Sequence, residues 1–256
     1  MTEPTGDQRA HGEASGALPT VHVVGLGPGG PDLVTSGTLE LIASIETQFL
    51  RTERHPAAVV MPDAQWFDRL YETADVIEDV YESIREAVIR TANSYGVVLY
   101  AVPGSPVVAE RSVQLLIEDP RVLTVVHPAM SFLDLAWARL GVDPVALGAK
   151  LVDGHRFNEV LEEVGEPGAL GDCVLVAQCD TKFVLSDIKL ASDLPLAETV
   201  TVLHHLGLDD ETVFSVAWED LDRSFEPDHL TSLWIEGIST RRVPQENLIR
   251  RRFGRP

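Results

Sequence analysis

The sequence predicts an α/β protein with two lobes, an N-terminal lobe with a parallel sheet and a C-terminal lobe with a mixed sheet. In the first half, apolar runs of strand length alternate with helical patterns, and fully apolar strands are typical of parallel sheets buried on both faces. In the second half, strand-like runs follow one another through short connections, which favours antiparallel pairing. We expect the two lobes to meet near residues 128–145.

The N-terminal lobe is assigned from the spacing of its apolar residues. Val80, Ile84 and Val88 recur at helical spacing, whereas the run Val97–Val102 is apolar throughout. The predicted strands are, in order, Val21–Leu26, Thr47–Leu50, Val97–Val102 and Leu123–His127. The predicted helices are Thr35–Ser44, Val76–Thr91, Val107–Glu118 and Ser131–Leu140.

The C-terminal lobe has a looser pattern with one well-defined helix, Thr181–Ser192. Its predicted strands are Lys150–Val152, Cys173–Ala177, Val200–His204, Val213–Trp218 and Ser232–Ile235. The resulting division gives a disordered tail at 1–19, lobes at 20–128 and 129–240, and a basic tail or linker at 241–256. The first tail is polar and rich in Gly, Ala and Ser, and the last segment carries six arginines and one glutamate.

Composition excludes several function classes. The 256-residue chain has a net charge of −20, and a field of that sign repels the phosphates of nucleic acids. No apolar run is long enough to cross a bilayer, and residues 1–19 lack the apolar core of a secretory leader. We therefore expect a cytoplasmic protein. Two cysteines, Cys173 and Cys179, are too few for a disulfide framework, and we interpret them as buried and reduced.

A glycine-rich loop follows the first strand. The run Gly25-Leu26-Gly27-Pro28-Gly29-Gly30 matches G-x-G-x-x-G, the pattern of dinucleotide sites. Pro28 and Pro31 lack backbone N–H donors, however, and the next helix starts only near Thr35, too late for its N-terminus to meet a pyrophosphate. A different ligand site at the strand ends is favoured over a purely structural turn, and over the NAD-type oxidoreductase that the glycine pattern suggests.

A second open loop follows the strand Val97–Val102. Two prolines and a glycine in Tyr100–Glu110 (YAVPGSPVVAE) force an irregular backbone at the carboxyl end of the sheet, where ligands bind in open α/β folds. Ser105 lacks the G-x-S-x-G context of a nucleophile elbow, so we interpret it as a ligand-contact residue.

Together these blocks resemble the tetrapyrrole methylase superfamily of S-adenosylmethionine (SAM) methyltransferases. Within it, the sequence is most similar to the methylase-like domain fused to MazG-type nucleoside triphosphate pyrophosphohydrolases, over about residues 20–237. The resemblance rests on Val21–Thr35 (VHVVGLGPGGPDLVT) and Tyr100–Glu110, and on the blocks Leu50–Pro56, Leu70–Glu72, Val80–Tyr81, Ser131–Asp134, Leu140–Pro144 and Leu230–Leu233.

The resemblance implies two lobes with SAM in the cleft between them. Its implied cofactor contacts are Val102, Pro103, Gly104, Ser105, Pro106, Val107, Ser131, Phe132, Leu133, Ala177 and Gln178. The glycine loop, with Gly25, Gly27, Pro28 and Gly29, would face the substrate. Tyr71 and Tyr81 resemble tyrosines near the acceptor site of peptide-backbone N-methylating relatives.

The acceptor is not identified by the sequence. Many tetrapyrrole methylases have Gly-Asp-Pro where this chain has Gly104-Ser105-Pro106, which argues against a tetrapyrrole and leaves another small molecule or a peptide. If that acceptor carries a proton, a base is needed. The candidates near the expected cleft are His55, His127, Tyr71, Tyr81 and Asp134.

The predicted function is a SAM-dependent methyltransferase of unknown acceptor, which the family implies to be a homodimer. The alternative is a catalytically silent SAM-binding or partner module associated with a MazG-type hydrolase. RNA ribose methylation, known in relatives, is disfavoured by the negative charge.

No metal site is predicted, and no pyrophosphohydrolase activity is expected from this chain. The acidic cluster Glu159, Glu162, Glu163 and Glu166 has no second acidic helix beside it, and we interpret it as a solvated helix face. His204 and His205 are adjacent on a strand and are expected on opposite faces, where they cannot chelate together.

Overall fold

The structure is a computed structural model that describes residues 17–164, 171–192 and 198–237, and the chain forms two compact units. Unit 1 holds the chain up to Gly25, Thr35–Arg54 and Ala58–Ala129; unit 2 holds Leu26–Val34, His55–Ala57 and the residues from Met130 onward. The basic tail, Glu166 and all of the predicted N-terminal tail before Ala17 lie outside the described residues. Within the described residues, no helix is long and apolar enough to cross a membrane.

Unit 1 is built on a five-stranded parallel sheet with the order β3-β2-β4-β1-β5. Its strands are β1 Thr20–Gly25, β2 Gln48–Leu50, β3 Gln65–Trp66, β4 Val97–Val102 and β5 Leu123–Val126. Its helices are α1 Ser36–Ser44, α2 Asp68–Thr73, α3 Ile77–Tyr95 and α4 Arg111–Glu118. Of the two short 3-10 turns in the connections, η1 Pro31–Leu33 belongs to unit 2, and η2 Pro56–Val60 begins in unit 2 and ends in unit 1.

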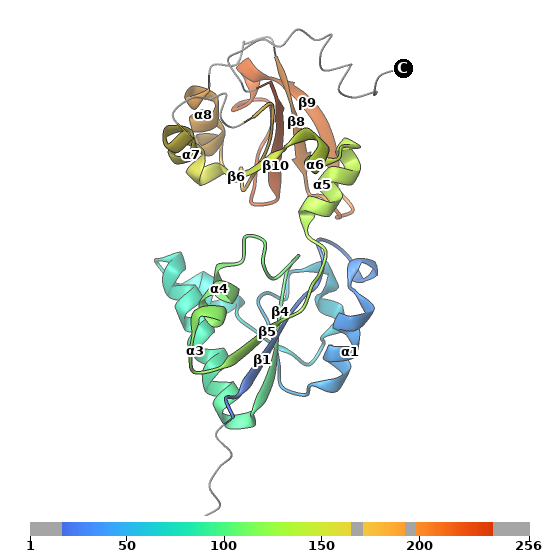
Figure 1. The fold of residues 1–256 in the computed structure, drawn as a ribbon, viewed down its shortest axis with the longest axis vertical. Coiled ribbons are helices and arrows are strands. Elements are labelled where there is room, and N and C mark those ends of the chain that lie inside the picture. Colours follow the sequence, from blue (N-terminus) through green and yellow to red (C-terminus); the bar gives the residue numbers. More distant parts are fainter. Residues whose placement is uncertain (1–16, 165–170, 193–197, 238–256) are drawn as a thin grey trace, which may run out of the picture. The chain divides into compact units, whose positions relative to one another are not determined.

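The core of unit 1 lies between this sheet and α3 with α4, while α1 covers the other face (Figure 1). Val80, Ile84 and Val88 of α3 are buried against the strands, as their helical spacing predicts. Because both faces of the sheet are covered, β4 is buried along its whole length after Val97.

Unit 2 contains a mixed sheet with the order β6-β7-β10-β8-β9, in which only β6 and β7 pair in parallel among the described strands. The strands are β6 Lys150–Asp153, β7 Cys173–Ala177, β8 Thr199–His204, β9 Thr212–Ala217 and β10 Thr231–Glu236. The helices are α5 Phe132–Leu140, α6 Pro144–Leu147, α7 Phe157–Val164 and α8 Lys182–Ala191, with 3-10 turns η3 Gly154–Arg156 and η5 Trp218–Asp220.

Alternate residues of β7 face two separate cores. Val174 and Val176 pack with α7 and α8, whereas Cys173 and Leu175 pack with α5 on the opposite face. Cys173 and Cys179 are buried and reduced, as predicted. Glu159, Glu162 and Glu163 are exposed on α7, which confirms the solvated face for the described members of the acidic cluster.

The predicted fold class is confirmed, β3 and α2 were not predicted, and the start of one helix is corrected. The sequence pattern predicts a helix from Val107, but α4 begins at Arg111. Residues 107–110 continue the loop because the Val108 N–H donates to Ser105 O in a turn and Ala109 has φ of 53°, in the left-handed region that stops a helix.

A close backbone approach at the end of β1 gives the first prediction. A Cβ on Gly25 would lie 2.1 Å from Gly104 O and 2.6 Å from the Cβ of Ala129. We expect Gly25→Ala to destabilise unit 1 by about 2–3 kcal/mol, because backbone atoms must move to make room. Urea denaturation measures the loss.

Gly37→Ala is the matched control, since a Cβ at Gly37 in α1 meets nothing within 4 Å. This substitution should raise stability by about 0.5–1 kcal/mol, because alanine is the better helix former. A Gly25→Ala protein as stable as wild type would contradict the close approach.

Candidate active site at the edge of the first sheet

Polar side chains converge at the carboxyl edge of the parallel sheet in unit 1. Arg51 follows β2 directly, and its backbone N–H donates to Ala101 O in β4 at 2.9 Å. Glu110 lies at the end of the loop that follows β4. Because β2 and β4 are parallel neighbours, both segments leave the sheet at the same edge.

A continuous set of hydrogen bonds, here called the Arg51 network, joins Arg51, Tyr71, Glu110, Ser112 and Tyr100. Arg51 donates from Nε to the Tyr71 hydroxyl at 2.9 Å and from a terminal nitrogen to Glu110 Oε2 at 2.7 Å. The other Glu110 oxygen accepts from the Ser112 hydroxyl at 2.8 Å, and Ser112 Oγ lies 2.8 Å from the Tyr100 hydroxyl.

The Arg51 network is buried at one end and partly open at the other. The Glu110 side chain is only 2% exposed and Tyr100 is fully buried, whereas the Arg51 side chain is 24% exposed. A carboxylate this deeply buried requires a charged partner. Although burial opposes it, the charge of Glu110 raises the pKa of Arg51, so the guanidinium keeps its proton.

Asp68 fixes the segment that carries Arg51. This buried carboxylate accepts from the Thr52 hydroxyl at 2.7 Å and from the Glu53 N–H at 2.9 Å. Asp68 is the first residue of α2, the helix that also carries Tyr71. The same short helix thus supplies one tyrosine of the site and anchors the arginine that this tyrosine contacts.

The structure brings Tyr71 and Tyr81 together. Their rings meet edge to face with centroids 6.5 Å apart, and both are half-buried. Burial raises the pKa of both hydroxyls, although Arg51 opposes the rise. Both tyrosines therefore stay protonated at neutral pH, where each hydroxyl can donate a hydrogen bond.

The loop predicted to contact the cofactor lies at the same edge of unit 1. Gly104 has φ of 63°, and the tight fit of Gly25 brings the backbones at the ends of β1 and β4 together with no side chain between them. Val102, Ser105 and Pro106 are buried, Pro103 and Gly104 are half-buried, and Val107 is exposed.

The other predicted cofactor residues belong to unit 2. Ser131 is occupied as the N-cap of α5, in a capping box with Asp134. Phe132 and Leu133 are half-buried in the first turn of that helix. Ala177 ends β7, and Gln178 follows it with φ of 56°, a backbone conformation that residues other than glycine rarely adopt.

The predicted base candidates outside the tyrosines have structural partners. In unit 2, His55 Nδ1 accepts from the Ala57 N–H at 3.2 Å, and the ring also bonds the Gly27 backbone. Burial lowers the His55 pKa, so this imidazole is neutral with both nitrogens engaged. His127 pairs with His22 at 3.0 Å, and Asp134 belongs to the α5 cap.

The glycine loop packs against a turn of unit 2. A Cβ on Gly29 would lie 2.3 Å from Gly207 O, and Gly27 has φ of 75°, so both positions need glycine. Pro28 lies between them, and α1 begins only at Ser36 with Thr35 as its N-cap. The late helix start is confirmed, and the loop lacks the helix N-terminus that a pyrophosphate needs.

Arg51 and Glu110 are site residues that were not predicted from the sequence. The signal was present: a charged residue stands directly after one predicted strand, and an opposite charge stands in the loop after another. Opposite charges at the ends of two parallel strands become neighbours if the strands pair. Strand order decides this, and the sequence pattern does not reveal strand order.

A family model shows to which family the chain belongs. The family model of tetrapyrrole (corrin/porphyrin) methylases matches residues 20–222. The uncharacterized protein YabN of Bacillus subtilis is 31% identical over 232 residues. The match covers 87% of this chain and 46% of YabN, so the chain spans about half the length of that relative.

Solved structures with the same fold include two methyltransferases. Uroporphyrin-III-C-methyltransferase from Thermus thermophilus is 20% identical with a TM-score of 0.64, over 86% of this chain and 95% of that one. The precorrin-6Y methylase of Archaeoglobus fulgidus is 21% identical with a TM-score of 0.59, over 86% and 99% of the two chains. A second Thermus structure of the former enzyme, with S-adenyl homocysteine bound, is 16% identical with a TM-score of 0.62, over 86% and 98%.

The buried ion pair gives a second prediction. We expect Glu110→Gln to lower the free energy of unfolding by about 2–4 kcal/mol, because it leaves the Arg51 charge without its partner. Equilibrium urea denaturation measures the change.

Glu159→Gln is the control, since it removes one carboxylate of the exposed Arg156–Glu159 pair. Its effect should stay within about 0.5 kcal/mol, as for other surface pairs. Equal effects of the two substitutions would mean that the buried Arg51–Glu110 pair contributes no more to the free energy of unfolding than an exposed pair does.

Proposed function

We propose, from the premise that this chain belongs to the tetrapyrrole methylase family, that it is a SAM-dependent methyltransferase acting on a small molecule or a peptide. The observation that carries the proposal is the Arg51 network, with Tyr71 and Tyr81 at the carboxyl edge of the parallel sheet. This edge is where open α/β folds bind their ligands.

The chain's own residues would orient the acceptor. Arg51 is held by Glu110 and donates to the Tyr71 oxygen, so the Tyr71 proton points away from Arg51 and is available to a substrate oxygen or nitrogen. Tyr81, packed against Tyr71, supplies a second hydroxyl. Two fixed donors position an acceptor atom at little entropic cost, and positioning is the main contribution of a protein to such a displacement.

In unit 1, the loop Val102–Val107 is the proposed cofactor contact. Pro103 and Gly104 are half-buried and Val107 is exposed, so part of this loop is open to a ligand at the edge where open α/β folds bind theirs. Phe132, Leu133 and Gln178 of unit 2 stay predicted cofactor contacts. When bound, SAM supplies the electrophilic methyl group.

The acceptor is proposed to differ from a tetrapyrrole. Ser105 stands where many family members have aspartate, and its side chain is buried, so this position offers no carboxylate to a cationic or N–H-rich ring. The hydrogen-bond donors at Tyr71 and Tyr81 suit an acceptor with a carbonyl or amide group.

A second candidate is a SAM-binding module that works with a MazG-type hydrolase and does not itself transfer methyl groups. The match covers only 46% of the Bacillus subtilis relative, so more than half of that protein lies outside the match, and the MazG-type partner stays a prediction. The homodimer and the cytoplasmic location expected from the sequence stay predictions.

Ligand binding gives the third prediction. Titration with SAM and with its demethylated product should raise the melting temperature of the full chain, and NAD should not. At 100 times the dissociation constant, the added stability is about 2.7 kcal/mol. Thermal unfolding at increasing ligand concentration measures it. If neither SAM nor its demethylated product raises the melting temperature, the cofactor assignment is wrong, and the proposed methyltransferase activity is wrong with it.

Catalysis gives the fourth prediction. Tyr71→Phe should lower methyl transfer at least tenfold while SAM affinity stays within about twofold, because the proposed role of the hydroxyl is to contact the acceptor and not SAM. The readout is formation of the demethylated product with labelled SAM and cell extract as the acceptor source.

Tyr95→Phe at the exposed end of α3 is the control and should leave turnover unchanged. SAM binding without turnover in the wild-type protein would favour the second candidate. Full activity of Tyr71→Phe would remove Tyr71 from the proposed mechanism.

A further inference from the structure

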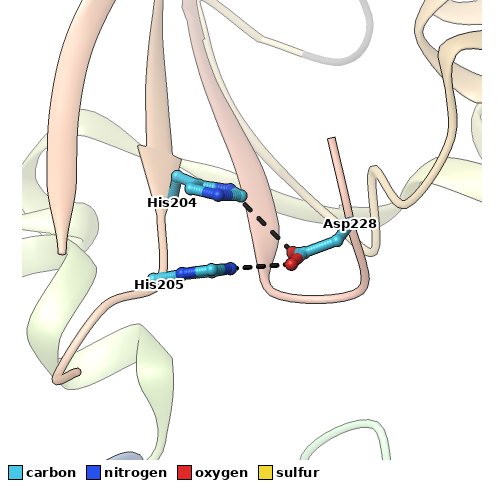
Figure 2. A group of neighbouring side chains, drawn as sticks. All are labelled: His204, His205 and Asp228. Carbon is cyan, nitrogen blue, oxygen red and sulfur yellow. Dashed lines mark hydrogen bonds and ion pairs between the residues drawn. The ribbon is translucent and has the colours of Figure 1, made fainter. Parts of the chain in front are cut away.

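Two adjacent histidines and an aspartate gather at one end of the second sheet. His204 ends β8, His205 begins the turn toward β9, and Asp228 lies in the loop before β10 (Figure 2). The expectation that the two histidines point to opposite faces is wrong. His205 has φ of 55°, and this backbone turns its ring onto that of His204, with centroids 3.8 Å apart and 19° between the planes.

The polar atoms of this histidine cluster face one another. His205 Nε2 lies 2.7 Å from Asp228 Oδ2, and His204 Nδ1 lies 3.9 Å from Asp228 Oδ1. One ligand atom from each residue lies within 4.8 Å of the other two. A tetrahedral zinc ion with bonds of about 2.0–2.2 Å holds its ligand atoms about 3.3 Å apart and lies in the plane of each imidazole ring, so the two stacked rings must tilt toward a common point to seat one.

A second, independent contact resembles the support found behind metal-binding histidines. His205 Nδ1, on the far side of the ring from Asp228, lies 2.7 Å from Asp210 Oδ2. Histidine ligands of metals almost always donate this second N–H to a carboxylate or carbonyl, which fixes the ring and directs the other nitrogen at the ion. On the other ring, the nitrogen nearest Asp228, His204 Nδ1, also lies 2.9 Å from the hydroxyl of the buried Thr231, and a metal bond at this nitrogen would replace that contact.

We propose that His204, His205 and Asp228 bind a divalent transition-metal ion through two imidazole nitrogens and one carboxylate oxygen. Imidazole with carboxylate suits zinc and its first-row neighbours. In the chain without metal His205 Nε2 lies at hydrogen-bond distance from Asp228, and a bound ion would take the place of that hydrogen bond. Three protein ligands leave a fourth position for water or another ligand.

The ion would join the end of β8 to the loop before β10. The same turn contains Gly207, whose carbonyl oxygen would lie 2.3 Å from a Cβ on Gly29 of the glycine loop. Metal binding at the histidine cluster would therefore stiffen the surface on which the glycine loop packs. The histidine cluster belongs to unit 2 and the Arg51 network to unit 1, and the test of the metal site does not depend on methyl transfer.

The test is calorimetric titration of the untagged full chain, stripped with EDTA, with Zn²⁺ alone. We expect one ion per chain. His205→Ala and Asp228→Asn should each weaken binding at least tenfold, because each removes a ligand. Asp210→Asn, which leaves all three ligands in place, should weaken it about tenfold through the lost support of the His205 ring.

His155→Ala is the matched control, since His155 forms a similar exposed pair with a single aspartate, Asp180, at 3.0 Å. The affinity of the His155→Ala variant for Zn²⁺ should stay within twofold of that of the wild type. Substitution by Co²⁺ gives an independent readout, because a tetrahedral site with nitrogen ligands produces visible absorption that His205→Ala should abolish. Absence of stoichiometric Zn²⁺ binding, or equal affinity in His205→Ala and His155→Ala, would overturn the proposal.

Discussion

The buried charge of Glu110 is the constraint on which the site in unit 1 depends. A carboxylate that is 2% exposed is stable only with a cation beside it, and Arg51 is the cation that the structure supplies. The pair therefore holds the end of β2 against the loop after β4. Tyr71 bonds the same guanidinium, so the placement of the proposed acceptor site follows from the pairing of one buried charge.

The pairing of Glu110 with Arg51 leaves α4 without a side-chain N-cap. Glu110 occupies the N-cap position of α4, but its side chain makes no cap hydrogen bond, because both carboxylate oxygens bond Arg51 and Ser112. By contrast, Thr35 and Ser131 cap α1 and α5 in the ordinary way. Natural proteins break such local rules mostly where a site needs the residue for something else.

The fold was largely predictable from the sequence, whereas the site was predictable only in its location. Buried parallel strands such as Val97–Val102 are set by local apolar runs, and they appear where the pattern places them. The Arg51–Glu110 contact joins residues 59 positions apart and depends on the order β2-β4, which no local pattern encodes. Tyr71 and Tyr81 were named from a family resemblance, and their contact with Arg51 came from the structure.

Residues with an unusual backbone conformation lie at or beside the proposed functional residues. The described residues include three non-glycine positions with positive φ: Ala109, Gln178 and His205. Ala109 precedes Glu110, Gln178 is a proposed cofactor contact, and His205 belongs to the histidine cluster. Such backbone conformations are unfavourable for residues other than glycine. They persist where the surrounding structure stabilises them, often at functional sites. An ordinary strand geometry at His205 would separate its ring from that of His204, so the cluster exists only because the backbone turns there.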